Sequence, residues 1–440
     1  FNWFDSNTLR QFLMGLIMTN EKIFIQIASY RDPELVPTLH DCIRKADNPQ
    51  NLVFSIAWQH SDEDAWDTLD DFKNDERFHI IDIKWNETKG TCWARNLTQS
   101  KYNGEGYTLQ IDSHHRFVKG WDSICKGMLS DLCDAGHEKP LLTAYLPSYD
   151  PEDDPGKRVK EVWKLNFDRF TPEGVIFMLP ATLEGWQDEP LPTPTRFFSA
   201  HFVFAYGHWN FEVPYDPNLY FHGEEISLAV RSFTQGYDMF IPNKIVAWHE
   251  YTRKGRAKHW DDNKTWEDLN KKSLKRVKKL LNVDGERDDT DFGIYGLGSV
   301  RTQSDYESFS GIRFEDRAVQ NYTLDNFDAP NPLYRTEKSY QRSFVHRFKH
   351  CIDLWKQSID PNIDWDGWAV IFEDEDGKSL YRQDADRNEI NRLKETHKDA
   401  DFYNVWRTFE YKGVPYKWII WPFSAQHGWG NKIEGLLPKV

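Results

Sequence analysis

Short apolar runs alternate with amphipathic segments through the first third of the chain. Four runs are bounded by turn residues and have the length of buried strands, at residues 22–30, 51–59, 79–85 and 106–112. The segments "ELVPTLHDCIRKA" and "GTCWARNLTQSKY", which follow the first and third runs, have the apolar spacing of helices. Strands that alternate with helices predict βαβ units and a largely parallel sheet, in which ligands bind beyond the carboxyl ends of the strands.

The same alternation continues to about residue 320. Further helices are predicted at 121–136, 222–237 and 271–281, and further strands at 140–149, 197–207 and 239–251. Residues 299–319 are expected to close this unit as a helix and a loop.

The remainder of the chain predicts a small antiparallel β unit behind a linker at about 325–345. Asp376-Gly377 separates two apolar runs, which indicates a hairpin, and Lys412-Gly413 separates two further runs in the same way. A length of 440 residues also favours more than one domain. We expect an N-terminal extension (1–21), an α/β domain (22–325) and a β-rich accessory domain (340–440).

Charge and cysteine content limit the classes of function. The formal net charge of −15 disfavours nucleic acid as a partner, and it makes an anionic substrate depend on a local cation. The five cysteines are odd in number and lack CxxC spacing, which favours a reduced, cytoplasmic setting over a disulfide framework. The sequence has no apolar run of eighteen residues that would predict a membrane span. The apolar patch at 12–18 lacks the flanks of a signal peptide, so we expect a short helix or a remnant ahead of a natural start near Met18.

Asp112-Ser113-His114 directly follows the fourth predicted strand. A carboxylate and an imidazole two positions apart would lie side by side beyond the sheet. Mg²⁺ and Mn²⁺ prefer carboxylate and water oxygens, and Mn²⁺ also accepts imidazole. The alternative is a capped turn, because Asp and Ser are common turn residues. His249 also ends a predicted strand, and it is either a third ligand or a structural histidine.

Glu224 and Glu225 begin the helix that is predicted after Gly223. Acidic residues at this position interact favourably with the helix dipole, and this alone stabilises the helix by about 0.3–1 kcal/mol for each residue. The functional alternative is that one of them points into an acceptor pocket. Successive helix positions point about 100° apart, so the two carboxylates are not expected to do the same work.

Arg31, Asp32 and Arg95 are candidates for contacts with a nucleotide. Arginine suits bidentate contacts with phosphate, and a nearby aspartate can accept from a base or a ribose. The alternative for each arginine is an ordinary ion pair. The chain has no GxGxxG, GxxxxGK[ST] or GxSxG motif, so a dinucleotide fold, a P-loop and a hydrolase elbow are not supported.

Five segments, taken in order, resemble one family of nucleotide-sugar-dependent glycosyltransferases: "IASYRDPEL", "GTCWARN", "LQIDSHHRFVKGWD", "FHGEEISLAVRSFTQGYD" and "WHEY". This is the family typified by the cytoplasmic UDP-GlcNAc:hydroxyproline polypeptide N-acetylglucosaminyltransferase, and the resemblance covers about residues 22–320. Asp-Ser-His is also similar to the metal motif of the mucin-type polypeptide GalNAc-transferases. The resemblance implies a GT-A fold, which is a Rossmann-like mixed sheet with flanking helices, and a retaining transfer from a UDP-sugar.

The resemblance also implies a role for each candidate residue. Asp112, His114 and His249 would hold Mn²⁺ or Mg²⁺ as a DxD-like motif, with His115 outside the set of ligands. Glu224 and Glu225 would be catalytic residues at the sugar and acceptor side. The donor, UDP-GlcNAc by this resemblance, would contact Ala28, Tyr30, Arg31, Asp32, Arg95, Asp112 and Ser113.

The acceptor and the accessory domain leave alternatives open. The acceptor is a hydroxyl, with hydroxyproline on a protein as the first hypothesis and a bacterial or viral glycan or hydroxymethylated DNA as the second. A non-enzymatic carbohydrate- or protein-binding module is the third, because the tail contains Trp406, Trp418, Trp421 and Trp429. The simpler interpretation, which we favour, is that these tryptophans form the core of a small β domain. The oligomeric state does not follow from the sequence.

Overall fold

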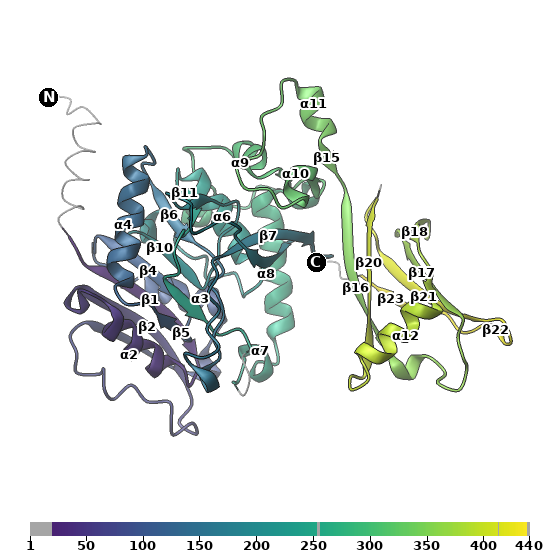
Figure 1. Ribbon diagram of the computed structural model, residues 1–440, viewed down its shortest axis with the longest axis horizontal. Helices are drawn as coiled ribbons and strands as arrows, with labels where there is room; N and C mark the ends of the chain where they lie inside the picture. The colour runs from purple at the N-terminus through teal and green to yellow at the C-terminus, as the bar shows by residue number, and fades with distance from the viewer. Residues whose placement is uncertain (1–19, 253–255, 412, 438–440) are drawn as a thin grey trace.

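An eight-stranded mixed sheet forms the centre of the α/β part of the molecule (Figure 1). The computed structural model describes residues 20–252, 256–411 and 413–437, so most of the extension expected at 1–21 lies outside the described residues. The strand order is β3-β2-β1-β4-β10-β6-β11-β9. The bounds are β1 Ile23–Tyr30, β2 Leu52–His60, β3 Phe78–Lys84, β4 Tyr107–Ile111, β6 Pro140–Thr143, β9 Thr193–Pro194, β10 Phe202–Tyr206 and β11 Asp238–Ile241.

Helices cover both faces of this sheet. Successive residues of β10 point to opposite faces of the sheet: Phe204 packs in the core beneath α2 and α4, and Val203 packs in the core beneath α6 and α8. The helices of this part are α2 Leu35–Lys45, α3 Thr91–Gln99, α4 Trp121–Asp134, α5 Trp209–Glu212, α6 Glu224–Thr234, α7 His259–Asp262, α8 Trp266–Leu281 and α9 Gln303–Ser310. Short 3₁₀ turns lie at η1 Pro49–Asn51, η2 Trp85–Glu87, η3 Pro151–Asp153, η4 Val283–Gly285 and η5 Gly293–Tyr295.

The four strands predicted first are confirmed as β1, β2, β3 and β4, and they are parallel to one another. The sheet as a whole is mixed, since β10 runs antiparallel to both β4 and β6. The single strand predicted at 239–251 is wrong, because the chain turns after β11 and then forms β12 (Ala247–His249) in another sheet. Pro242 has no backbone N–H to donate to a ladder, so the strand stops there.

Two small antiparallel pairs lie outside the main sheet. Strand β5 (His115–Phe117) pairs with β12, and β7 (Trp163–Phe170) pairs with β8 (Ile176–Thr182) as a hairpin. The first pair joins the loop after β4 to the loop after β11. The second pair borders the cavity described below.

The C-terminal part is an antiparallel β unit with a hydrophobic core of its own, built around Ile352, Trp368, Val370, Val405 and Ile420. In Figure 1 it lies beside the α/β part, and β16 is its strand nearest to β7. Its strands are β16 Arg347–Trp355, β17 Gly367–Glu373, β18 Ser379–Arg382, β19 Ala385–Asp386, β20 Phe402–Glu410, β21 Lys417–Ser424, β22 Gly428–Trp429 and β23 Ile433–Leu436, together with η6 Lys356–Ser358 and α12 Arg387–Thr396. The predicted fold class, a mixed sheet with flanking helices followed by a small antiparallel β unit, is therefore confirmed.

One of the two hairpins predicted in this unit is confirmed. Strands β17 and β18 pair across the Asp376-Gly377 turn. Strands β20 and β21 do not pair with each other, because β20 pairs with β16 and β21 pairs with β17. The prediction of a second hairpin at Lys412-Gly413 is wrong for this reason, and Lys412 itself lies outside the described residues.

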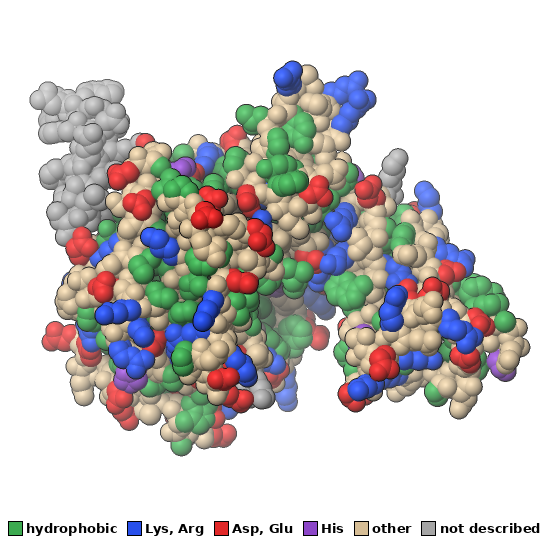
Figure 2. All heavy atoms as spheres, in the orientation of Figure 1, with side chains coloured by type: hydrophobic (Ala, Val, Ile, Leu, Met, Phe, Trp, Pro, Cys, Tyr) green, Lys and Arg blue, Asp and Glu red, His purple; other side chains and the backbone are tan. Residues whose placement is uncertain are grey.

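The segment between the two parts is structured. It contains α10 (Asn321–Leu324), α11 (Glu337–Arg342) and β15 (Phe344–Val345), and β15 pairs with β14 (Ala318–Gln320), which pairs with β13 (Ile312–Arg313). The domain boundary at about 325–340 stays a prediction. On the face shown in Figure 2, acidic and basic side chains are interspersed over both parts. Within the described ranges, no helix is both long enough and apolar enough to cross a membrane.

Candidate active site

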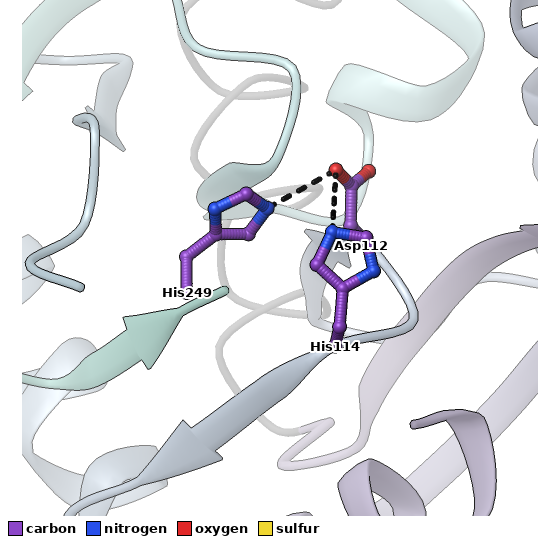
Figure 3. A group of neighbouring side chains, drawn as sticks. All are labelled: Asp112, His114 and His249. Carbon is purple, nitrogen blue, oxygen red and sulfur yellow. Dashed lines mark hydrogen bonds and ion pairs between the residues drawn. The ribbon is translucent and has the colours of Figure 1, made fainter. Parts of the chain in front are cut away.

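Asp112, His114 and His249 meet at the ends of three strands (Figure 3). Asp112 follows β4, His114 precedes β5, and His249 ends β12, which is held beside β5 by the pairing of His249 with His115. Oδ2 of Asp112 lies 3.7 Å from Nε2 of His114 and 3.4 Å from Nε2 of His249. The three ligand atoms lie within 4.8 Å of one another. Two residues close in sequence and one far from them therefore present one carboxylate and two imidazoles to one point.

The donor chemistry of this cluster fits a divalent metal. Nδ1 of His114 donates to Oδ2 of Asp32 at 2.7 Å, which leaves Nε2 as the ring nitrogen that faces Asp112 and that a metal can bind. That Nε2 is buried and has no hydrogen-bond partner among the described residues. A buried imidazole nitrogen without a partner is costly unless something binds it. An oxygen ligand with two imidazoles suits Mn²⁺ better than Mg²⁺.

Neighbouring groups keep both aspartates ionised. Burial alone would raise the pKa of Asp112, but the hydrogen bond with His249 and the charges of Arg95 and His114 hold that pKa well below its usual range. Burial would also raise the pKa of Asp32, but the interactions with His114 and Arg256 outweigh burial, so the pKa of Asp32 falls to about 2. Both carboxylates are thus available as a ligand and as an orienting acceptor at neutral pH.

A cavity of about 450 Å³ opens in front of these groups. Its walls come from the ends of β1 and β4, the N-terminus of α6, strand β8 and residues 256–260. The residues expected at the site line it with one exception; they are Ala28, Tyr30, Asp32, Arg95, Asp112, Ser113, His114, Glu224, Glu225 and His249.

The exception is Arg31, whose side chain is held outside the cavity lining. Its backbone has a φ of 44°, and its guanidinium is bound by Asp64 at 2.7 Å and Asp262 at 3.0 Å. Arg95, in contrast, is buried beneath the cavity and donates to Oδ1 of Asp112. Its Nε and Nη1 have no hydrogen-bond partner among the described residues. Arg95 therefore has donors to spare for an anionic group.

Glu224 and Glu225 occupy different environments, as their helical spacing predicts. The carboxylate of Glu225 accepts from the backbone N–H of Ala200 at 2.8 Å and from the hydroxyl of Tyr145 at 3.2 Å. Burial raises the pKa of Glu225 to about 7, although these two hydrogen bonds oppose the rise. Burial and the adjacent Glu225 charge raise the pKa of Glu224 well above its usual value. Glu224 therefore holds its proton more strongly than a free carboxyl group does, and Glu225 can gain or lose a proton near neutral pH.

Sequence reasoning missed four residues that complete the site. The ring of His201 stacks on His249 with 4.1 Å between centroids, and the ring of Tyr251 meets His249 edge-on at 4.3 Å. Arg256 donates to Oδ2 of Asp32 at 2.8 Å, and Tyr145 holds Glu225. The one available signal was a histidine inside the apolar run "FFSAHFVFAYG".

The family model of Glycosyltransferase (GlcNAc) matches residues 22–79 and 67–316, which is more than half of the chain. The chain belongs to this family and is a glycosyltransferase. A comparison with curated protein sequences gives no significant match.

Several solved structures are similar at low identity. GalNAc-T7 with UDP, GalNAc and Mn²⁺ has a TM-score of 0.44 and 12% identity, over 65% of this chain and 54% of that one. Staphylococcus aureus TarS with UDP-GlcNAc has a TM-score of 0.37 and 12% identity, over 61% and 68%. The mannosyltransferase PcManGT from Pyrobaculum calidifontis, with GDP-Man and Mn²⁺, has a TM-score of 0.36 and 10% identity, over 59% and 71%. The chain thus spans about half the length of the GalNAc-T7 chain.

Proposed function

We propose that this protein is a metal-dependent, retaining glycosyltransferase that moves GlcNAc from UDP-GlcNAc to a hydroxyl group, with hydroxyproline on a protein as the acceptor. The observation that carries the proposal is the buried Nε2 of His114, which has no hydrogen-bond partner among the described residues and lies beside Asp112 and His249, in a member of a GlcNAc-transferase family. The cavity volume of about 450 Å³ lies within the range of small-molecule sites. The reduced, cytoplasmic setting and the division into domains at 22–325 and 340–440 belong to the same proposal.

Each side chain has a distinct task in this proposal. Asp112, His114 and His249 would hold Mn²⁺, which when bound neutralises diphosphate charge and so favours departure of UDP. Arg95 binds a diphosphate oxygen with its spare donors, as a buried guanidinium does well. Asp32 keeps His114 in the tautomer whose Nε2 is free.

The transfer itself needs no dedicated nucleophile. The acceptor oxygen forms a bond to the anomeric carbon on the face that UDP leaves, the bond from that carbon to the UDP oxygen breaks, and the acceptor proton passes to the departing phosphate oxygen. Glu225 orients the acceptor or the sugar by accepting from a hydroxyl, and protonated Glu224 donates to the sugar. Both roles rest on the different surroundings of the two carboxyl groups, since burial and the neighbouring charge raise the pKa of Glu224, whereas Glu225 is also held by Ala200 and Tyr145.

Hydrolysis of UDP-sugars tests the proposal without knowledge of the acceptor. We expect release of UDP from UDP-GlcNAc with Mn²⁺, loss of release with EDTA, and a fall of at least about 100-fold in Asp112→Ala, since a metal ligand and the partner of Arg95 are both lost. Asp64→Ala is the matched control, because Asp64 pairs with Arg31 outside the cavity lining. Equal release by wild type and Asp112→Ala, with and without EDTA, would contradict the metal-dependent reaction. A wild type that neither binds UDP nor hydrolyses any UDP-sugar would favour a binding module instead.

A further inference from the structure

Strand β8 borders the cavity along its edge and not along one face. Five consecutive residues of this strand, from Ile176 to Pro180, line the cavity. Successive residues of a strand point to opposite faces. Ile176 and Met178 belong to the core, whereas the side chain of Leu179 is exposed. Because the cavity touches members of both sets, it lies against the edge of the strand, where the backbone N–H and C=O groups point.

The register of the hairpin shows which backbone groups face the cavity. Leu183 N–H donates to the carbonyl of Val162, and Thr171 N–H donates to the carbonyl of Val175, at the two ends of the pair. With the observed register, Phe177 and Leu179 exchange hydrogen bonds with β7.

The alternate residues, Ile176 and Met178, direct their N–H and C=O groups away from β7. In the described part of the chain, β7 is the only strand that pairs with β8. No other described residue forms a backbone hydrogen bond with those groups of Ile176 and Met178. The edge of β8 is therefore a row of open donors and acceptors beside the cavity.

This edge crosses the candidate site from one side to the other. At one end the ring centroid of Phe177 lies 6.2 Å from that of His222, which is two residues before Glu224. At the other end Thr182 pairs with Trp163, whose ring lies 6.0 Å from Tyr251, the neighbour of His249. A strand of this length spans roughly 20 Å. A molecule that follows the edge would pass both the glutamates and the cluster of Asp112, His114 and His249.

We infer that the proposed protein acceptor binds as an extended segment, which adds as a strand to the free edge of β8. A repeat of one N–H and one C=O at every second residue is matched by another polypeptide backbone, and strand addition to an open edge is a known mode of peptide recognition. Sugar hydroxyls do not have this repeat. Pro180 has no N–H, so pairing is confined to the end of β8 that contains Ile176 and Met178. The inference rests on the proposed transfer to a hydroxyl on a protein, and it adds where and in which conformation that protein segment is bound.

Hydrogen exchange at single amides tests the inference on the unmodified protein. The probes are three blocked nine-residue peptides of alternating Thr and Val, with Ser, Thr or 4-hydroxyproline at the fifth position. We expect at least one of them, with UDP and Mn²⁺ present, to slow exchange at the amides of Ile176 and Met178 by about tenfold or more, while those of Phe177 and Leu179 are slow throughout. If none of the three peptides protects Ile176 and Met178, the inference is wrong. Protection that increases with protein concentration in the absence of peptide would assign the edge to a second copy of the chain, and that result also overturns it.

Backbone methylation of the peptides supplies the matched control. N-methyl groups on the two residues that flank the fifth position, or on the residues two positions away, remove donors from opposite edges of the bound strand. We expect one of these sets to weaken the peptide about tenfold or more and the other to be tolerated. Equal effects of the two sets would refute strand addition. Release of UDP from UDP-GlcNAc without peptide is measured in parallel, so that a failure of the donor reaction is distinguished from a failure of strand addition.

Discussion

Replacement of Asp32 by Asn is the most informative single change, because Asp32 is not one of the three proposed metal ligands but is hydrogen-bonded to one of them, His114. Its Oδ2 accepts from Nδ1 of His114 at 2.7 Å, from the hydroxyl of Ser113 at 2.7 Å and from Arg256 at 2.8 Å. Asn has the same shape and retains one acceptor oxygen, but it carries no charge. The variant therefore tests the carboxylate itself and not the space that it fills.

The expected loss is one of metal affinity. Removal of a carboxylate that orients a metal-ligating histidine lowers metal affinity by about 10–100-fold, which corresponds to about 1.4–2.7 kcal/mol of binding free energy. Because Asn preserves an acceptor for the N–H of His114, we expect a loss of about tenfold for Asp32→Asn and more for Asp32→Ala. The fall of the Asp32 pKa to about 2 agrees in direction, since the charged form is the one that His114 and Arg256 stabilise after burial has opposed it.

Titration of Mn²⁺ followed by electron paramagnetic resonance measures this affinity directly and does not depend on turnover. Asp64→Asn is the control, because it makes the same chemical change at a carboxylate that pairs with Arg31 outside the cavity lining. Thermal unfolding of both variants checks that they fold. Binding of Mn²⁺ by Asp32→Asn with the affinity of wild type, or an equal loss in Asp64→Asn, would refute the role of Asp32.

Three further outcomes are expected. Burial raises the pKa of Glu225 from 4.5 to about 7 in the folded state, so wild type loses stability relative to Glu225→Gln as pH rises through that interval. Urea unfolding measures the difference in stability between the two proteins. A difference that is constant from pH 4.5 to 7.5 would contradict the prediction. Gly223 caps α6 with a φ of 99°, and an added Cβ would lie 3.1 Å from Val277. Gly223→Ala should therefore lower the free energy of unfolding by about 1–2 kcal/mol in the same assay. Gly104 has open space around it, so Gly104→Ala should show only the part of this cost that comes from the backbone conformation. Ile352→Ala in the C-terminal core should lower the free energy of unfolding by about 2–5 kcal/mol. If the two parts are separate domains, calorimetry will show one unfolding transition at a lower temperature and the other unchanged.

The strands of the α/β part were predictable because they are local patterns. Runs such as residues 23–30 are buried on both faces and carry few polar residues, so their composition identifies them. The pairing of strands was not predictable in the same way. Strands β20 and β21 are adjacent in sequence, yet each pairs with a more distant strand. Alternation states which face of a strand is apolar, but it does not state which strand lies beside it.

The site was predictable where its residues terminate strands and not where they depend on distant partners. Asp112, His114 and His249 follow from strand ends, and the structure places their ligand atoms together. Arg31 also ends a strand, but it is drawn aside by Asp262, which lies 231 positions later in the chain. Arg256 reaches Asp32 over 224 positions, and no local pattern indicates that contact.

The paired charges of the site explain how a preformed cluster of acidic residues can accept an anionic donor. The carboxylate of Asp112 is bound by Arg95 and that of Asp32 by Arg256, so each negative charge near the proposed metal has a buried positive partner. In the proposed function Arg95 would bind the diphosphate, because two of its donors have no hydrogen-bond partner among the described residues. The attraction between this guanidinium and a diphosphate would be stronger in the low-dielectric cavity than in water. A chain with a net charge of −15 would thus need no basic surface to bind the proposed nucleotide-sugar, because the attraction would come from arginine side chains buried at the site.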